Sequence, residues 1–143
     1  MKTSCMSSGR DNPRVVLDTN VYISALLFGG IPAEIIELGR EKKIQILSSS
    51  SILLELAKIL QDKFSFQRRM IFNVIAEIKR FSEIIYPKQK LNVIGKDKAD
   101  NKILECALEG KSKYIISGDS HILELKEFRG IKILSPSEFI KTF

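Results

Sequence analysis

Four carboxylates, well separated along the chain, have the side-chain type and the positions of a divalent-metal site. They are Asp18, Glu55, Asp100 and Asp119. Asp18 and Asp119 each follow a short β-branched run, and in an open parallel sheet the carboxyl ends of the strands form the ligand-binding crevice. Two carboxylates about 4 Å apart repel by roughly 4 kcal/mol at an effective dielectric of about 20. A cation such as Mg²⁺ or Mn²⁺ removes that repulsion, so metal chemistry is the first hypothesis.

The elements that must position these acids alternate between apolar strands and amphipathic helices. This alternation predicts a single α/β domain in which helices cover both faces of a central, mostly parallel sheet. The expected strands are 14–17, 44–47, 114–117 and 131–134. The expected helices are 21–28, 33–42, 52–63, 67–85, one from about 100 to 108, a short one after 120, and 136–141, with a lysine-rich loop over 88–99.

The longest of these helices, 67–85, is predicted from one apolar stripe with spacings of three and four residues. The stripe consists of Met70, Ile71, Val74, Ile75, Ile78, Phe81 and Ile85. Such a stripe indicates a helix face that packs on the core, which is architecture and not chemistry.

Length and composition fit one soluble domain over residues 14–143, preceded by a flexible tail over 1–13. The chain has 143 residues, of which 44% are hydrophobic and 28% charged, enough to bury a core without disulfides. Its two cysteines, Cys5 and Cys106, lie in no metal-binding pattern, which favours a reducing, cytoplasmic setting. No apolar run approaches the length of about eighteen residues needed to span a bilayer, so a membrane protein is not expected.

The balance of charge is basic, with a formal net charge of +6 and a pI near 9.4. Lysine and arginine gain affinity for polyanions by displacing counterions from phosphates, so a nucleic-acid partner is favoured. Lysine-rich surfaces also serve solubility alone, so the charge supports this partner only mildly.

Three of the four acids have a simpler reading as helix caps or turn residues. Asp18 and Asp100 each precede or open a predicted helix, where an aspartate commonly caps the first turn. Asp119 lies in a glycine-containing turn, where aspartate is common for local hydrogen-bonding reasons. Taken singly, each of these aspartates is better explained by capping or a turn, and only the four acids together point to metal binding.

Glu55 is harder to explain by local structure. On a helix with about 100° per residue, Ile52 and Ile59 lie only about 60° and 40° from it, so Glu55 borders the apolar face. A solvated glutamate prefers the opposite side of a helix. The placement therefore favours a functional carboxylate, although glutamates at such a boundary are frequent.

The order of the acids, together with their flanking residues, resembles the PIN-domain family, and most closely its VapC-like members from toxin–antitoxin systems. The resemblance covers nearly all of the chain after the tail. It rests on four motifs, which are Val-Leu-Asp-Thr-Asn-Val at 16–21, Leu-Leu-Glu-Leu-Ala at 53–57, Asp-Lys-Ala-Asp-Asn-Lys-Ile-Leu-Glu-Cys-Ala at 97–107 and Ile-Ser-Gly-Asp at 116–119. Four motifs in this order are a fairly specific signal, whereas Asp-Thr-Asn alone is a weak one.

The resemblance implies a three-layer α/β/α fold and RNA cleavage with Mg²⁺ or Mn²⁺. It also implies an antitoxin protein as partner, and homodimers are common in the family. Two positions depart from the family pattern: Ser117 stands where many relatives have threonine, and Ala99 where some have a further acid. Asp97 is a candidate to replace that acid in part.

Roles for the matching residues follow from what phosphodiester hydrolysis needs, a nucleophilic hydroxide and charge relief on the leaving oxygen. Asp18, Asp100 and Asp119 are assigned as direct or water-mediated metal ligands. Glu55 is either a ligand or the group that accepts a proton from the attacking water. Asn20, Ser117 and Asp97 are candidates to orient these carboxylates, with a simple cap or turn contact as the alternative.

Other chemistries fit the residues less well. His121 is the only histidine, so a pair of catalytic histidines is excluded. A haloacid-dehalogenase-like phosphatase needs a second aspartate two positions after the first, where Asn20 stands, and the features of a phosphate-accepting receiver domain are absent. Lys96, Lys98 and Lys102 can steer phosphates to the third acid, although a solvated lysine-rich loop explains them too.

Two further alternatives stay open. One is a PIN nuclease of RNA processing or quality control, and the other is an inactive PIN-like module that binds RNA or protein. Four retained acids argue against the inactive module, because an unneeded acidic cluster has an electrostatic cost.

Overall fold

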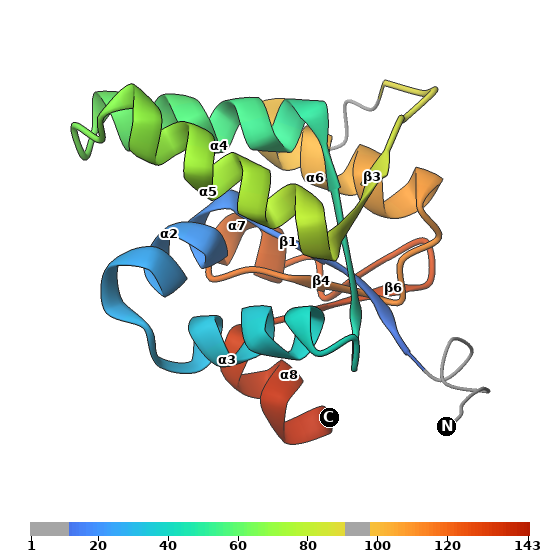
Figure 1. Cartoon of the computed structure of the whole chain (residues 1–143). Coiled ribbons are helices and arrows are strands. Elements are labelled where there is room, and N and C mark those ends of the chain that lie inside the picture. Colours follow the sequence, from blue (N-terminus) through green and yellow to red (C-terminus); the bar gives the residue numbers. More distant parts are fainter. Residues whose placement is uncertain (1–11, 91–97) are drawn as a thin grey trace.

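The computed structural model describes residues 12–90 and 98–143, with the backbone alone at 98–100. In this part of the chain the centre of the fold is a six-stranded sheet in the spatial order β3-β2-β1-β4-β6-β5 (Figure 1). Neighbouring strands are parallel except for β5 and β6, which are antiparallel. The strands are β1 (Arg14–Leu17), β2 (Gln45–Ser49), β3 (Ser82–Ile85), β4 (Tyr114–Ile116), β5 (Glu127–Phe128) and β6 (Ile131–Leu134).

Helices cover both faces of this sheet, which confirms the predicted three-layer α/β/α architecture. In Figure 1, α4, α5 and α6 lie on one side, and α3 and α8 lie on the other. Helix α6 packs on β1, β2 and β4, while α3 contacts β2 and α8. The helices are α2 (Thr19–Phe28), α3 (Gly30–Arg40), α4 (Ser50–Asp62), α5 (Arg68–Phe81), α6 (Lys98–Glu109), α7 (Ser120–Leu123) and α8 (Pro136–Thr142).

The order of the strands places a crevice at the centre of the sheet. The chain builds β1, β2 and β3 outward in one direction and then crosses back to lay β4 on the other side of β1. At such a switch point the connections after the two central strands leave in opposite directions, so the carboxyl ends of those strands remain open to a ligand. The crevice of this sheet therefore lies beyond Leu17 of β1 and Ile116 of β4, which are partners in the ladder.

Local signals in the sequence explain where the helices around this crevice begin and end. Ser49 ends β2 and caps α4 at once, its Oγ accepting a hydrogen bond of 3.2 Å from the N–H of Ile52. Gly29 separates α2 from α3 with a φ of 69°, a left-handed backbone conformation that glycine adopts without strain. The chain consequently turns by 106° between these two helices.

The predicted helix 67–85 is wrong in its last turn and in one residue of its stripe. Helix α5 ends at Phe81, and residues 82–85 form β3, the edge strand paired with β2. Met70 is 48% exposed and lies off the core face, whereas Ile78 is buried. The sheet supplies backbone partners that outweigh the continuation of a helical apolar stripe, and a strand of four residues is too short to show a period of its own.

The close approach of α3 to β2 depends on Gly39. A Cβ at this position would collide with the side chain of Ile46, approaching its Cγ1 to 2.9 Å as well as its Cδ1. We expect Gly39→Ala to lower the free energy of unfolding by about 1–3 kcal/mol, the usual cost of overpacking a well-packed core. Denaturant titration is the measurement. Gly118→Ala is the control, because its Cβ meets nothing within 4 Å; equal midpoints for the two variants would contradict the prediction.

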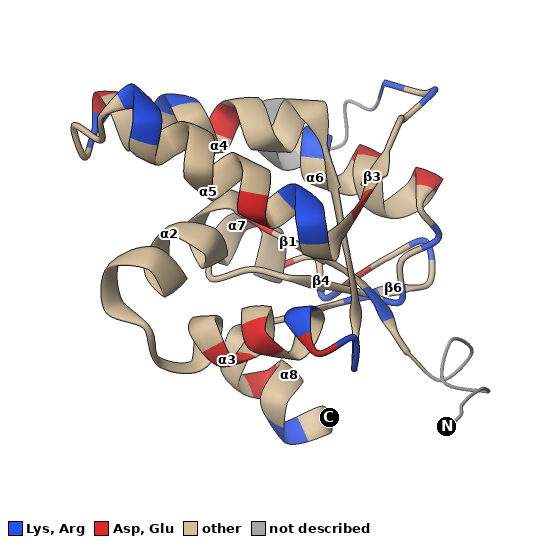
Figure 2. Cartoon of the chain, in the orientation of Figure 1, with Lys and Arg blue, Asp and Glu red and all other residues tan. Residues whose placement is uncertain are grey.

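Charge is distributed over the surface in short ion pairs and unpaired cations. Figure 2 shows Lys and Arg on the chain around β6 and near the connection between α4 and α5. Arg14 on β1 forms a two-pronged pair with Glu83 on β3, at 2.9 and 3.1 Å. This pair holds the pKa of Glu83 below its usual range through the Arg14 hydrogen bonds.

Two remaining expectations concern cysteine chemistry and membranes. Cys106 is buried in α6, and burial raises the pKa of its thiol to about 12, so this thiol is unreactive at neutral pH. Cys5 lies outside the described residues. No single described helix has the length and apolarity of a membrane span, while α2 and α3, bent by 106°, reach that length and composition only together.

Candidate active site

Asp18 is held at the crevice by the extension of the central ladder beyond β1. Its N–H donates a hydrogen bond of 2.9 Å to the carbonyl oxygen of Ile116, the residue that ends β4. The side chain is only 6% exposed. The sequence places it there because Val15, Val16 and Leu17 form a fully buried strand, after which the chain must turn into α2. A carboxylate is thus fixed at the switch point of the sheet.

Ser117 joins Asp18 to Asp119. Its Oγ donates a hydrogen bond of 2.7 Å to Oδ2 of Asp18 and accepts one of 3.0 Å from the N–H of Asp119. The Ser117 side chain is fully buried, and its own N–H donates to the carbonyl oxygen of Leu134 on β6. One hydroxyl therefore uses both its donor and its acceptor capacity to fix the two acids relative to each other.

The electrostatics of this pair favour a cation. Burial raises the pKa of Asp18, and the neighbouring Asp119 carboxylate raises it further, while the Ser117 hydroxyl and the N–H groups of Thr19 and Asn20 oppose the shift. Burial is the largest of these effects. An ionised carboxylate in such a place is stabilised by a positive charge brought beside it, which is what a metal ion supplies.

Capping, the simpler explanation of the three aspartates, holds for Asp119 and not for Asp18 or Asp100. Helix α6 begins at Lys98, so Asp100 lies inside its first turn and is not its N-cap. Asp119 does cap α7, because its Oδ1 accepts a hydrogen bond of 2.8 Å from the N–H of His121. The Asp18 side chain makes no capping hydrogen bond to the described helix α2. Its hydrogen bond to Ser117, 99 residues away, connects two strands and not a helix turn.

Several of the described helices begin at the carboxyl edge of the sheet. Helices α2, α4 and α7 follow directly after the parallel strands β1, β2 and β4, and α6 runs back into β4, so its first turn also lies at the carboxyl edge. Helix N-termini carry partial positive charge, which stabilises carboxylates and phosphates nearby. The N–H groups at the starts of these helices therefore lie at the edge of the sheet where Asp18 and Asp119 meet.

Two of the predicted acids stand on these helices. Glu55 lies in the second turn of α4, half-buried, with no hydrogen bond or ion pair to any described residue. Asp100 lies in the first turn of α6, where the backbone alone is described. Asp97 lies outside the described residues. The structure thus brings Asp18, Ser117 and Asp119 into contact and leaves the assignment of the other acids as a prediction.

The donors at this edge fit a hard divalent cation. Asp18 and Asp119 offer carboxylate oxygens, the ligand type that Mg²⁺ and Mn²⁺ prefer, whereas the structure does not group Glu55 of α4 with them. The described residues, which exclude the Asp100 side chain, contain no ready cluster of three or more acidic, histidine or cysteine ligands. A complete ligand set therefore requires Asp100 or water in addition to the described pair.

Buried polar residues near the crevice were not singled out from the sequence. Thr19 and Asn101 are 5% and 4% exposed, the first beside Asp18 and the second beside Asp100. The signal that identifies Asn101 is its place next to an acid at the start of a helix whose following residues are apolar. Asn20, which was singled out, is exposed, and only its backbone N–H acts on Asp18.

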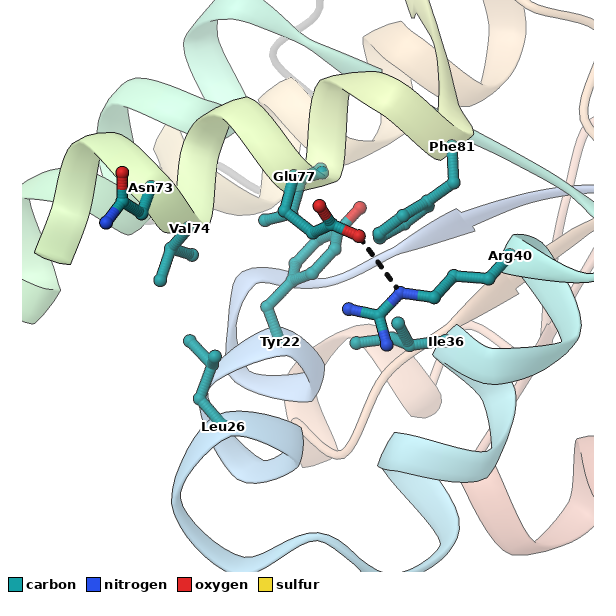
Figure 3. A pocket seen from close by; sticks show the side chains of 9 residues that line it. Tyr22, Leu26, Ile36, Arg40, Asn73, Val74, Glu77 and Phe81 are labelled. Atoms are coloured by element: carbon teal, nitrogen blue, oxygen red, sulfur yellow. Dashed lines mark ion pairs between the residues drawn. The ribbon is translucent and has the colours of Figure 1, made fainter.

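An apolar hollow of about 230 Å³ lies between α2, α3 and α5, and we call it the α2–α5 hollow. Figure 3 shows Tyr22 and Leu26 of α2 lining it, with an ion pair of 3.3 Å between Arg40 and Glu77 across it. Tyr22 is 1% exposed, and its hydroxyl has no hydrogen-bond partner among the described residues. Helix α2 thus connects the crevice at Asp18 with a separate apolar surface at Leu26.

Comparison with known proteins agrees with this architecture. The chain is similar to the uncharacterized protein MJ1680 of Methanocaldococcus jannaschii, with 36% identity over 91% of each chain. The fold of the present chain is shared by a chain of VapBC2 from Rickettsia felis, a complex solved bound to a promoter DNA fragment. The TM-score is 0.60 and the identity 18%, and the match covers 85% of this chain and 98% of that one. PAE2754 from Pyrobaculum aerophilum gives the same TM-score at 11% identity, over 96% and 92%.

The family is established by the sequence itself. The model of the PIN domain, a family of nucleases, matches residues 14–121. That range runs from the start of β1 into the first turn of α7 and contains all four predicted acids. The chain with its buried aspartate at the switch point therefore belongs to the PIN-domain family.

Proposed function

We propose that this chain is an endoribonuclease that uses Mg²⁺ or Mn²⁺ and acts as the toxin of a toxin–antitoxin pair. The observation that carries the proposal is the buried Asp18 carboxylate, held by Ser117 opposite Asp119 at the switch point of the sheet. A nuclease of the PIN family gives this costly arrangement a use, because the two carboxylates would hold a cation that activates water and polarises a phosphodiester.

The residues divide the work as follows. Asp18, Asp119 and Asp100 would hold the metal, with Glu55 as a further ligand or as the acceptor of a proton from the attacking water. When bound, such an ion lowers the pKa of water and polarises the phosphoryl group. Ser117 orients the Asp18 carboxylate and opposes in part the rise of its pKa, since its hydroxyl donates to Oδ2. The helix N-termini at this edge favour the anionic phosphates of RNA.

The proposed antitoxin would cover the crevice by lying along α2. Two observations support it: the fold is shared with a chain of a VapBC complex, and α2 exposes Leu26, which lines the α2–α5 hollow, and Phe28 at its end. Helix α2 has ten residues and is about 15 Å long, so an apolar partner segment at its far end would lie within about that distance of Asp18. Co-expression with the product of a small adjacent gene tests this; co-purification and loss of cleavage are expected. Cleavage that continues in such a complex would favour the RNA-processing alternative.

The catalytic proposal is tested by cleavage of end-labelled single-stranded RNA by the purified full chain. We expect internal cuts with Mg²⁺ or Mn²⁺ and none with EDTA, because without a metal ion the carboxylates at the crevice have no means to polarise the phosphoryl group. Calorimetric titration with Mn²⁺ provides a readout that does not depend on substrate. Protein that binds no metal and cuts none of several unrelated RNAs would be a binding module instead.

A further inference from the structure

A second hollow, of about 390 Å³, lies at the opposite edge of the sheet from Asp18. We call it the basic hollow and define it by six of its lining residues, Arg14, Lys111, Lys113, Tyr114, Phe139 and Phe143. Arg14 begins β1, and the two lysines precede β4, so these residues mark the amino ends of the central strands. Strands of three or four residues, at about 3.3 Å each, separate the hollow from the acids by at least about 10 Å.

The cations at the basic hollow differ in whether they already have partners. Arg14 is occupied by Glu83 and by the carbonyl oxygen of Gly110, which its Nε reaches at 2.9 Å. Lys111 and Lys113 form no ion pair with any described residue, and no Asp or Glu is among the described residues that line the hollow. Lys132 does not line the hollow, but it lies opposite Tyr114 in the ladder, so its side chain stands on the same face of the sheet, and it has no ion pair in the described part of the chain. Three lysines are therefore available to an anion.

Aromatic rings extend from the core to the mouth of the same hollow. Tyr114 and Phe139 meet edge to face at 5.6 Å, and Phe139 and Phe143 lie 5.7 Å apart. The first two rings are buried, whereas Phe143 is 54% exposed. Lys113 Nζ lies 5.5 Å from the centre of the Tyr114 ring. An exposed ring supported from below, beside unpaired cations, is the arrangement on which unpaired bases stack while their phosphates are neutralised.

We propose that the basic hollow binds a single-stranded segment of RNA away from the cleavage site. Lys111, Lys113 and Lys132 hold phosphates, and Phe143 stacks on a base. Single-stranded RNA fits better than a duplex, because stacking on Phe143 requires an unpaired base. The inference deepens the proposed function by adding a substrate-holding surface, and it rests on that function for the identity of the polyanion.

Fluorescence anisotropy with labelled single-stranded RNA tests this in the full chain carrying Asp18→Asn, in EDTA, so that cleavage does not enter the readout. Lys111, Lys113 and Lys132 are replaced together by glutamine. We expect weaker binding and a plot of log affinity against log salt concentration whose slope is less steep by about 2. Each of the three lost phosphate contacts accounts for about 0.7 of this change. Phe143→Leu should weaken binding about tenfold and leave the salt slope unchanged, because stacking releases no counterions.

The matched control replaces Lys63, Arg68 and Arg69 by glutamine, which removes the same charge from exposed positions just after α4 and at the start of α5. An equal loss of slope in both triple variants would mean diffuse attraction and overturn the proposal. A loss of affinity for duplex DNA, with the affinity for single-stranded RNA unchanged, would overturn it as well. With native Asp18, the lysine variant should raise KM and leave kcat within about twofold. If the wild type cuts no RNA, the anisotropy result still decides the binding site separately.

Lys111→Gly separates binding from folding. Lys111 has a φ of 53°, a left-handed conformation in which a side chain is strained and glycine is not. The variant should therefore have a higher Tm than the wild type while binding RNA more weakly. Unchanged RNA affinity in this more stable protein would remove Lys111 from the proposed surface.

Discussion

Asp18→Asn is expected to lower RNA cleavage by about 10³-fold or more. Loss of a metal-binding carboxylate removes several kcal/mol of charge stabilisation from the transition state, and about 4 kcal/mol corresponds to that factor. The asparagine in this variant keeps the size of the side chain, and its amide oxygen can still accept from Ser117, so the fold is retained. Single-turnover cleavage with saturating Mn²⁺ is the measurement. The control is Asp62→Asn, the same change at an exposed position at the end of α4.

The same substitution should stabilise the metal-free protein, and this gain should depend on pH. Because the pKa of Asp18 is raised in the folded chain, the folded state binds more protons than the unfolded state between the ordinary aspartate value and the raised one. Its contribution to stability is present at low pH and is lost as pH rises through the folded pKa. The Tm advantage of Asp18→Asn should therefore grow in EDTA as pH rises above about 4, the ordinary aspartate pKa.

A contrary result for Asp18 would be informative in either assay. Cleavage that survives in Asp18→Asn at the wild-type rate would place the chemistry outside the crevice. A Tm advantage that is independent of pH would mean that the buried carboxylate is not the titrating group. Mn²⁺ should reverse the order of stability, because a ligand that binds only the folded wild type raises its Tm by mass action.

Ser117→Ala is expected to lower Mn²⁺ affinity and cleavage by about 10- to 100-fold. Removing the hydroxyl takes a donor from Asp18 and an acceptor from the Asp119 N–H, and groups that orient metal ligands typically have effects of this size. Since the Ser117 hydrogen bond lowers the pKa of Asp18, its loss raises that pKa further. The acid limb of the pH–rate profile should consequently move to higher pH, because metal binding requires the ionised carboxylate.

Conservative replacement distinguishes a positioning role from a structural one. Ser117→Thr keeps the hydroxyl and should retain the wild-type pH profile, whereas Ser117→Ala should not. Ser137→Ala, at an exposed position in α8, is the control for loss of a serine hydroxyl. If Ser117→Ala lowers only Tm and leaves the profile in place, then Ser117 supports the fold and not the site.

Much of the architecture was readable because it depends on local patterns. The strands at 14–17 and 131–134 were predicted with the bounds they have, since short β-branched runs between turn residues have few alternatives. The edge strand β3 was not predicted, because Phe81 and Ile85 also fit a helical stripe and only pairing with β2 decides between the two. Strand β5, two residues long, exists solely through its pairing with β6.

By itself, the sequence determined the family and predicted which residues carry the chemistry: the acids, their order and the motifs around them lie within the match to the PIN domain over 14–121. Only the tertiary structure decided which of those residues are buried and which groups they hydrogen-bond. Asp18 proved to be bonded to Ser117, 99 residues away, while Asp119 also caps a helix. The physical reason is that the type of a side chain is given by the sequence at one position, whereas its burial and hydrogen-bond partners arise when distant strands come together in one sheet.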